Sequence, residues 1–208
     1  MPNDLTTIAG VSKELGERVL EKTKEKLEDV WDDLLLKDRQ AIERACKISP
    51  GAAAVWFERG MLCEATHKLD SAAASYQRAL SINANHAMAH MQLGTLFGRS
   101  GNDAMALKHF GAAVRVLPNS SRAHNNFATA NFAANNLAVA ERHYRRAVVI
   151  SPEYFNAQFN LARVLVGMGR KDLALKELKR AAFLRPNEPA VQQLLKQVGG
   201  KWIYSGLD

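Results

Sequence analysis

Histidine and cysteine are the residues of this chain most able to do chemistry, because their side chains can bind metals or act as acids, bases and nucleophiles. The sequence has six histidines and two cysteines among its 208 residues. Four histidines form two pairs with the same separation along the chain: His90 with His124, and His109 with His143. A pair can hold a metal only if the fold brings its members close together. The elements that carry the histidines therefore decide the question.

Motifs typical of catalysis are missing from the sequence. It has no glycine-rich phosphate loop, no paired-cysteine motif and no His-Glu-x-x-His sequence. We therefore predict a protein that is not an enzyme, with no catalytic residue, no bound metal and no cofactor.

A fixed period sets the positions of prolines and alanines. Pro118, Pro152 and Pro186 are evenly spaced, with a 34-residue step between them. Two rows of alanine keep the same step: Ala72, Ala106, Ala140 and Ala174, and Ala79, Ala113, Ala147 and Ala181. A repeat of this length indicates one helical hairpin, copied and stacked.

Counting each proline as position 32 gives four full units: 53–86, 87–120, 121–154 and 155–188. Apolar residues recur in each unit at three- and four-residue steps, which places them on one face of a helix. We expect two antiparallel helices per unit, over positions 1 to 14 and 18 to 31. Gly101, Gly169 or the pair Asn135 and Asn136 would form the turn between them, and the proline would end the second helix.

Two further positions complete the pattern. Position 8 is small in every unit, as Gly60, Gly94, Ala128 and Ala162, and position 24 is large, as Tyr76, Phe110, Tyr144 and Leu178. This pattern resembles the tetratricopeptide repeat. Position 4, usually aromatic in that family, keeps the expected ring only in the first unit, as Trp56, and reads His90, His124 and Gln158 in the others. The resemblance implies an all-α fold, a right-handed α-solenoid with a concave groove lined by the first helices and a convex face made by the second.

The interpretation as stacked repeats argues against metal binding by the histidine pairs. Residues at the same position of adjacent units lie about one helix-packing distance apart, roughly 8 to 10 Å. Zinc bonds are only about 2 Å long, so His90 cannot share an ion with His124, nor His109 with His143. Cys46 and Cys63 fall at packing positions, and we predict that both are small core residues in a reducing compartment.

The ends of the chain differ from the repeats. We predict an amphipathic helical segment over residues 1–40, the second helix of a partial repeat over 41–52, and a capping helix with an apolar tail over 189–208. In the first segment Leu27, Val30, Trp31 and Leu34 follow helical spacing, with charged residues between them. The segment either caps the solenoid or docks onto another copy, a partner or a membrane surface.

The resemblance implies that ligands contact positions 2, 5, 6, 9, 12 and 13 of each first helix. The predicted groove residues are Phe57, Glu58, Met61, Met88, Met91, Gln92, Thr95, Arg99, Arg122, Asn125, Asn126, Thr129, Phe132, Asn156, Phe159, Asn160 and Arg163. Methionines and aromatics there would suit apolar anchors, and amides would bond a peptide backbone. We expect a peptide or protein partner.

Charge is distributed unevenly. Residues 1–40 carry seven basic and ten acidic side chains, a net of −3, so residues 41–208 must carry +10 to give the total of +7. We predict a basic convex face made of Lys108, Arg115, Arg142, Arg145, Arg146, Lys176, Lys179 and Arg180, and we place His109 and His143 on the same outward side. Such a face is either merely solvated or contacts an acidic partner, an anionic membrane or the acidic segment of a neighbouring copy. Nucleic acid is not expected, because no aromatic residues are interleaved with these bases.

The predicted function is a protein-protein interaction scaffold that binds a peptide or partner in the concave groove, within a larger cytoplasmic assembly. No apolar run approaches the roughly 18 residues that cross a bilayer, and no export signal is visible at the N-terminus. The alternative is a self-assembling structural or coat protein of a secretion, pilus or organelle system, peripheral to a membrane or organelle. That protein would form homo-oligomers through its N-terminal helix and basic convex face.

Overall fold

Stacked helical hairpins make up the part of the chain that the computed structural model describes, residues 37–199. Residues 37–48 are helical. The helices that follow are α2 (Ala53–Ala65), α3 (Leu69–Ile82), α4 (Ala87–Arg99), α5 (Asp103–Val116), α6 (Ser121–Ala133), α7 (Leu137–Ile150), α8 (Phe155–Gly167), α9 (Lys171–Leu184) and α10 (Pro189–Gln197). The predicted helix before residue 37 and the apolar tail lie outside the described residues. None of the helices within 37–199 is long and apolar enough to cross a membrane.

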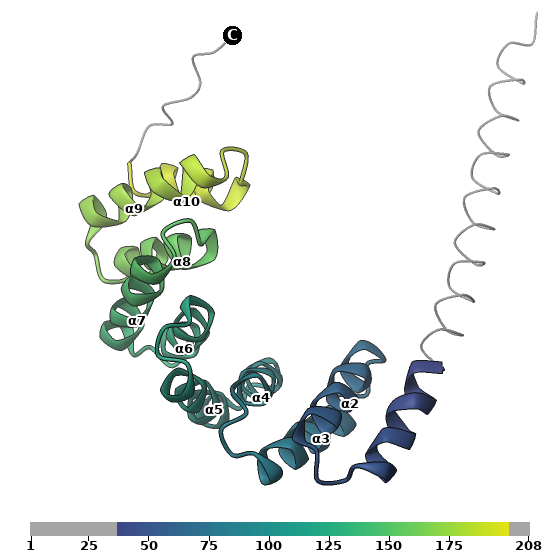
Figure 1. The fold of residues 1–208 in the computed structure, drawn as a ribbon. Coiled ribbons are helices and arrows are strands. Elements are labelled where there is room, and N and C mark those ends of the chain that lie inside the picture. Colours follow the sequence, from purple (N-terminus) through teal and green to yellow (C-terminus); the bar gives the residue numbers. More distant parts are fainter. Residues whose placement is uncertain (1–36, 200–208) are drawn as a thin grey trace, which may run out of the picture.

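The hairpins follow one another along an arc. The two helices of each hairpin pack together, and each hairpin contacts the next. Helices α4, α6 and α8 line the inner side of the arc, whereas α5, α7 and α9 form its outer side (Figure 1). Helix 37–48 and α10 lie at its two ends. The predicted α-solenoid of antiparallel hairpins is confirmed.

Small side chains let the helices of each hairpin approach closely. The two alanine rows at positions 20 and 27 are at most 1% exposed. A Cβ atom added at Gly94 would lie 2.7 Å from a ring carbon of Phe110, which is closer than real Cβ atoms come to other atoms. Position 8 is therefore small because the ring at position 24 occupies the space beside it. Of the two free cysteines, Cys46 is buried and Cys63 is half-buried.

The turn within each hairpin has a residue with left-handed backbone conformation at the same repeat position. Position 15 has a positive φ in all four repeats, at His67 (57°), Gly101 (75°), Asn135 (58°) and Gly169 (73°). Glycine and asparagine suit this conformation, since they adopt it with little strain. The predicted turn residues are correct, and the first repeat places a histidine there instead.

Second helices end two residues before position 32. Helices α5, α7 and α9 stop at Val116, Ile150 and Leu184, ahead of their prolines. Helix α3 stops at the matching residue, Ile82, although Ala84 replaces the proline. Proline therefore reinforces a boundary that packing with the next hairpin already sets.

Candidate functional site

The inner side of the arc carries most of the predicted groove residues at its surface. Glu58, Met61, Met88, Arg99, Arg122, Thr129, Asn156 and Arg163 are exposed, and Phe57, Gln92, Thr95, Asn126, Phe132, Phe159 and Asn160 are half-buried. Met91 is an error of the prediction. It is 2% exposed and packs against Ala113 and Ala123. Position 5 of this repeat therefore contacts the next hairpin and offers no surface to a ligand. Asn125, at position 5 of the third repeat, is also buried, although it lines a pocket of the groove.

This pocket, of about 420 Å³, opens between α4 and α6. It exists because its lining is rich in residues with little or no side chain, namely Gly94, Gly98, Ala106, Ala130 and Ala133. The ring of Phe110 supplies an apolar wall behind Gly94. Polar side chains surround this apolar part: Thr95, Arg99, Asp103, Asn125, Asn126 and Thr129. Its volume falls in the range of small-ligand sites, about 300 to 1,000 Å³, so it can accept a large apolar side chain.

Hydrogen-bonded amides continue from the pocket along α6 and α8. The guanidinium of Arg163 donates to Oδ1 of Asn160 at 3.3 Å, and Nδ2 of Asn160 donates to Oδ1 of Asn125 at 3.2 Å. Nδ2 of Asn125 then donates to Oδ1 of Asn126 at 3.3 Å. This chain of bonds fixes the orientation of each amide before a ligand arrives. We refer to these four residues as the amide ladder.

A polar cluster around the carboxylate of Glu64 joins α2, α3 and α4. Oε2 of Glu64 accepts from the hydroxyl of Tyr76 at 3.0 Å and from Nε2 of Gln92 at 3.2 Å. Arg99 approaches the same carboxylate at 3.9 Å. Burial is the main cause that raises the pKa of Tyr76, so the phenol stays protonated as a donor. Glu64 occupies position 12, a groove position, but is absent from the predicted set, as are the pocket residues Gly98 and Phe110.

Comparison with known proteins decides the family. Tetratricopeptide repeat profiles match residues 53–86, 91–155 and 131–198. The chain belongs to the tetratricopeptide repeat family. Proteins of this family are generally non-catalytic scaffolds. In a comparison with curated proteins, none matches this sequence.

Solved structures share the fold at low identity. The crystal structure of YrrB, described as a tetratricopeptide repeat protein with an unusual peptide-binding site, is 17% identical and covers 80% of this chain and 86% of its own, with a TM-score of 0.69. MamA protein is 20% identical over 70% of this chain and 80% of its own, with a TM-score of 0.66. The first tetratricopeptide repeat domain of Spaghetti, bound to an HSP90 peptide, is 21% identical over 54% of this chain and 90% of its own, with a TM-score of 0.53.

Paired histidines join the two helices of the second and third tetratricopeptide repeats. His90 lies against the carbonyl oxygen of Ala84 through Nε2 at 3.1 Å, and its Nδ1 lies 3.0 Å from Nδ1 of His109. Because a carbonyl only accepts, Nε2 of His90 carries the proton, and Nδ1 of His109 must be the donor to His90. His124 repeats this arrangement with the carbonyl of Pro118 at 3.0 Å and His143 at 2.9 Å.

Both pairs are structural contacts, in which His109 and His143 are neutral. Burial, followed by the neighbouring histidine and a basic residue, lowers the pKa of His109 and of His143 to about 4. His109 is 8% exposed and stacks on Phe97, so its predicted outward placement is wrong. Position 23 faces the first helix of its own repeat. The sequence signal for these pairs is their shared separation within one repeat, from position 4 to position 23, and comparing histidines only between repeats misses it.

The predicted basic residues lie on α5, α7 and α9, the outer helices. All are exposed except Arg145, which is half-buried. Arg145 and Arg170 both bind the carboxylate of Glu141 at 2.9 Å, and Arg180 binds that of Glu177 at 3.1 Å. Part of the positive charge on the outer side is therefore neutralised locally.

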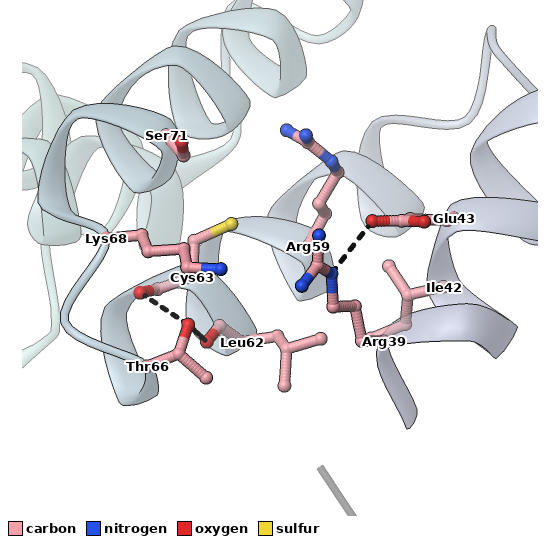
Figure 2. A pocket seen from close by; sticks show the side chains of 9 residues that line it. All are labelled: Arg39, Ile42, Glu43, Arg59, Leu62, Cys63, Thr66, Lys68 and Ser71. Atoms are coloured by element: carbon pink, nitrogen blue, oxygen red, sulfur yellow. Dashed lines mark hydrogen bonds and ion pairs between the residues drawn. The ribbon is translucent and has the colours of Figure 1, made fainter. Parts of the chain in front are cut away.

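A small polar pocket marks the junction of helix 37–48 with the first repeat. Arg39, Ile42 and Glu43 from that helix face Arg59 and neighbouring side chains of α2 across it (Figure 2). Its volume is about 80 Å³, well below that of small-ligand sites. Arg59 occupies position 7, which is apolar in the later repeats, and its guanidinium donates to Oγ of Ser75 at 2.6 Å. We interpret the pocket as a polar seam between helices.

Proposed function

We propose that this tetratricopeptide repeat protein is an interaction scaffold that binds a peptide segment of a partner protein in its concave groove, as part of a larger assembly. The observation that carries the proposal is the apolar pocket beside Phe110 with the amide ladder next to it. A peptide needs both, since an apolar anchor supplies affinity and amides satisfy its backbone groups.

The partner segment would place one large apolar side chain in the pocket. Its backbone would run along α6 and α8, where Nδ2 of Asn126 has no bond within the described residues and can donate to a peptide carbonyl. Arg99, Arg122 and Arg163 are exposed on the same side and would favour acidic side chains or a terminal carboxylate. YrrB and Spaghetti support the proposal as relatives in fold whose structures concern peptide binding.

Gly98 offers a way to close the pocket without disturbing the fold. A Cβ atom at this position meets only the Cβ of Ala106, at 3.9 Å, so the rest of a leucine side chain can extend into the pocket. Gly98→Leu also replaces glycine within a helix and should raise stability by about 0.8 kcal/mol. Lost binding by this variant would therefore not reflect unfolding.

The experiment is an affinity capture from the native cell followed by measurement of the captured protein's affinity. We expect Gly98→Leu to weaken binding about tenfold or more, because an anchor of leucine or phenylalanine size contributes about 1.5 to 3 kcal/mol. Asn126→Ala combined with Asn160→Ala should also weaken it. Ala104→Leu, exposed on α5 and outside the pocket, is the matched control. Partners held equally by all four proteins would refute binding in the groove.

A further inference from the structure

Position 29 of the repeats carries the clearest unexplained feature of the outer side. This position is exposed in every repeat, as Ser81, Arg115, Val149 and Phe183. The first two residues are polar, as a solvent-facing position requires. Val149 and Phe183 are apolar, yet 69% and 72% exposed. Two large apolar side chains at a solvent position of consecutive repeats indicate a covered surface.

The two residues line a single groove between α7 and α9. The groove measures about 660 Å³, and its apolar walls include Val148, Pro152 and Leu184. Lys179 and Arg180 also line it, as does one acidic residue, Glu153. We call this the outer groove. An apolar groove between two helices can take the apolar stripe of a third.

Positive charge gathers on the same two helices. Helix α7 has three arginines against one glutamate, and α9 has four basic residues against two acidic ones, a net of +2 on each. Helix α3 is neutral, with Asp70 against Arg78, and α5 has a net of +1. Apolar exposure and basic charge therefore coincide in the third and fourth repeats. An occupant should be apolar on one side and acidic beside it.

Residues 27–34 of the chain itself have this composition. Leu27, Val30, Trp31 and Leu34 follow the one-face spacing of a helix, and all four residues between them are acidic: Glu28, Asp29, Asp32 and Asp33. We propose that this acidic segment of one copy docks in the outer groove of another copy. The apolar stripe would cover Val149 and Phe183, and the acidic side chains would lie near Lys179 and its basic neighbours.

The occupant must come from a second copy. Residue 34 is only three residues from residue 37, a reach of about 11 Å when fully extended. Helix 37–48 stands at the opposite end of the arc from α9 (Figure 1). Contact between the two ends of successive copies is head-to-tail, and such an interface does not close on itself unless the rotation completes a ring. The assembly should therefore grow with concentration.

An anionic membrane fits the outer groove less well. Val149 and Phe183 line a hollow between two helices, and a flat bilayer surface fills such a hollow less well than a helix does. A charged amphipathic helix fits a hollow, so the second copy is the favoured occupant.

Sedimentation velocity of the full chain over a range of concentrations tests the proposal. We expect association into species that grow with concentration. Val149→Ser combined with Phe183→Ser installs the polar residue that Ser81 already provides at this position, so the fold should persist by circular dichroism. The double variant should weaken association about tenfold or more, because it removes two buried apolar anchors. Arg115→Ser, at the same exposed position of the second repeat, is the control and should leave association unchanged.

A peptide of residues 21–36 provides the second measurement. Full chain with Asp32→Lys and Asp33→Lys should fail to associate but should bind the labelled peptide in fluorescence anisotropy. Adding Phe183→Ser to that chain should abolish peptide binding. A full chain that stays monomeric and does not bind the peptide would overturn the proposal.

Two further outcomes would also overturn it. Association that Gly98→Leu weakens and Phe183→Ser does not would place the segment in the concave groove. Binding to vesicles of anionic lipid that is lost with Val149→Ser and Phe183→Ser, with association unchanged, would assign the outer groove to a membrane. Neither outcome would refute peptide binding in the concave groove, but the first would make a second copy of this chain its ligand.

Discussion

Acidification should destabilise the two central repeats through their histidine pairs. The pKa of His109 and of His143 falls from 6.5 in the unfolded chain to about 4 in the folded protein. Between pH 6.5 and pH 4 the unfolded chain therefore binds more protons than the folded protein, so the free energy of unfolding decreases as the pH falls through this window. The stabilisation is fully present above pH 6.5.

The magnitude follows from these pKa values. With about 1.4 kcal/mol per pKa unit, each histidine costs up to about 2 kcal/mol between pH 7 and pH 5. Solvent screening of the half-buried His143 reduces its share, so the two together cost about 2 to 4 kcal/mol. For a urea dependence of about 2 kcal/mol per molar, the unfolding midpoint should fall by about 1 to 2 M. Burial lowers the pKa of His90 in the same direction.

Urea unfolding followed by circular dichroism at pH 7 and pH 5 measures the effect. His109→Gln combined with His143→Gln keeps a donor for the partner histidine and removes both titrating groups. This variant should lose most of the difference between the two pH values. His67→Gln, which changes an exposed histidine in a turn, is the control and should keep it. An equal pH dependence in the double variant and the wild type would refute the assignment to these pairs.

The remaining predictions concern stability at pH 7, measured as urea midpoints. Gly94→Ala should destabilise by about 1 to 3 kcal/mol because its Cβ meets the ring of Phe110, whereas Gly98→Ala on the same helix should stabilise by about 0.8 kcal/mol; equal effects would contradict the packing argument. His67→Gly should stabilise by about 1 kcal/mol, since it removes a left-handed residue that has a Cβ, and no gain would show that its side chain compensates. Glu141→Ala should cost about 1 kcal/mol through the loss of two partly exposed arginine contacts, and a loss of several kcal/mol would mean that these contacts are far stronger than surface ion pairs.

The sequence predicts the solenoid well because the repeat places the same residue type at the same packing position four times. The alanine rows and the boundary residues near Pro118 lie where the register puts them. The turn residues Gly101 and Gly169 also have the expected left-handed backbone. An error of a residue or two in the predicted boundary of one helix does not carry over to the next, because the regular spacing fixes the position of each repeat separately.

The groove was less predictable, because it depends on contacts between repeats. Position 5 faces both the groove and the next hairpin, and the partner side chains decide which one prevails. Met91 is buried there, whereas Phe57 is half-buried. The pocket arises because Gly98 has no side chain and Ala133 has only a methyl group. A list of residue types that contact ligands does not show where small residues leave such a space.

Position 4 shows how a departure from the family pattern can keep the physical role. Trp56 keeps the expected ring, and its indole N–H donates to the carbonyl of Pro50 at 3.0 Å. His90 and His124 replace that ring, yet each donates in the same way to the carbonyl six residues before it. Gln192, one period beyond the last full repeat, donates in the same way to Pro186 at 3.4 Å. The shared property is an N–H donor on a flat side chain. It satisfies the carbonyl that proline or alanine leaves free where a second helix ends, and it thereby ties these hairpins to the ones before them. Gln158, at position 4 of the fourth repeat, is the exception, since its side chain donates to Glu177. In two repeats histidine meets this requirement with a second nitrogen left over for its partner, which couples the stacking of these hairpins to pH.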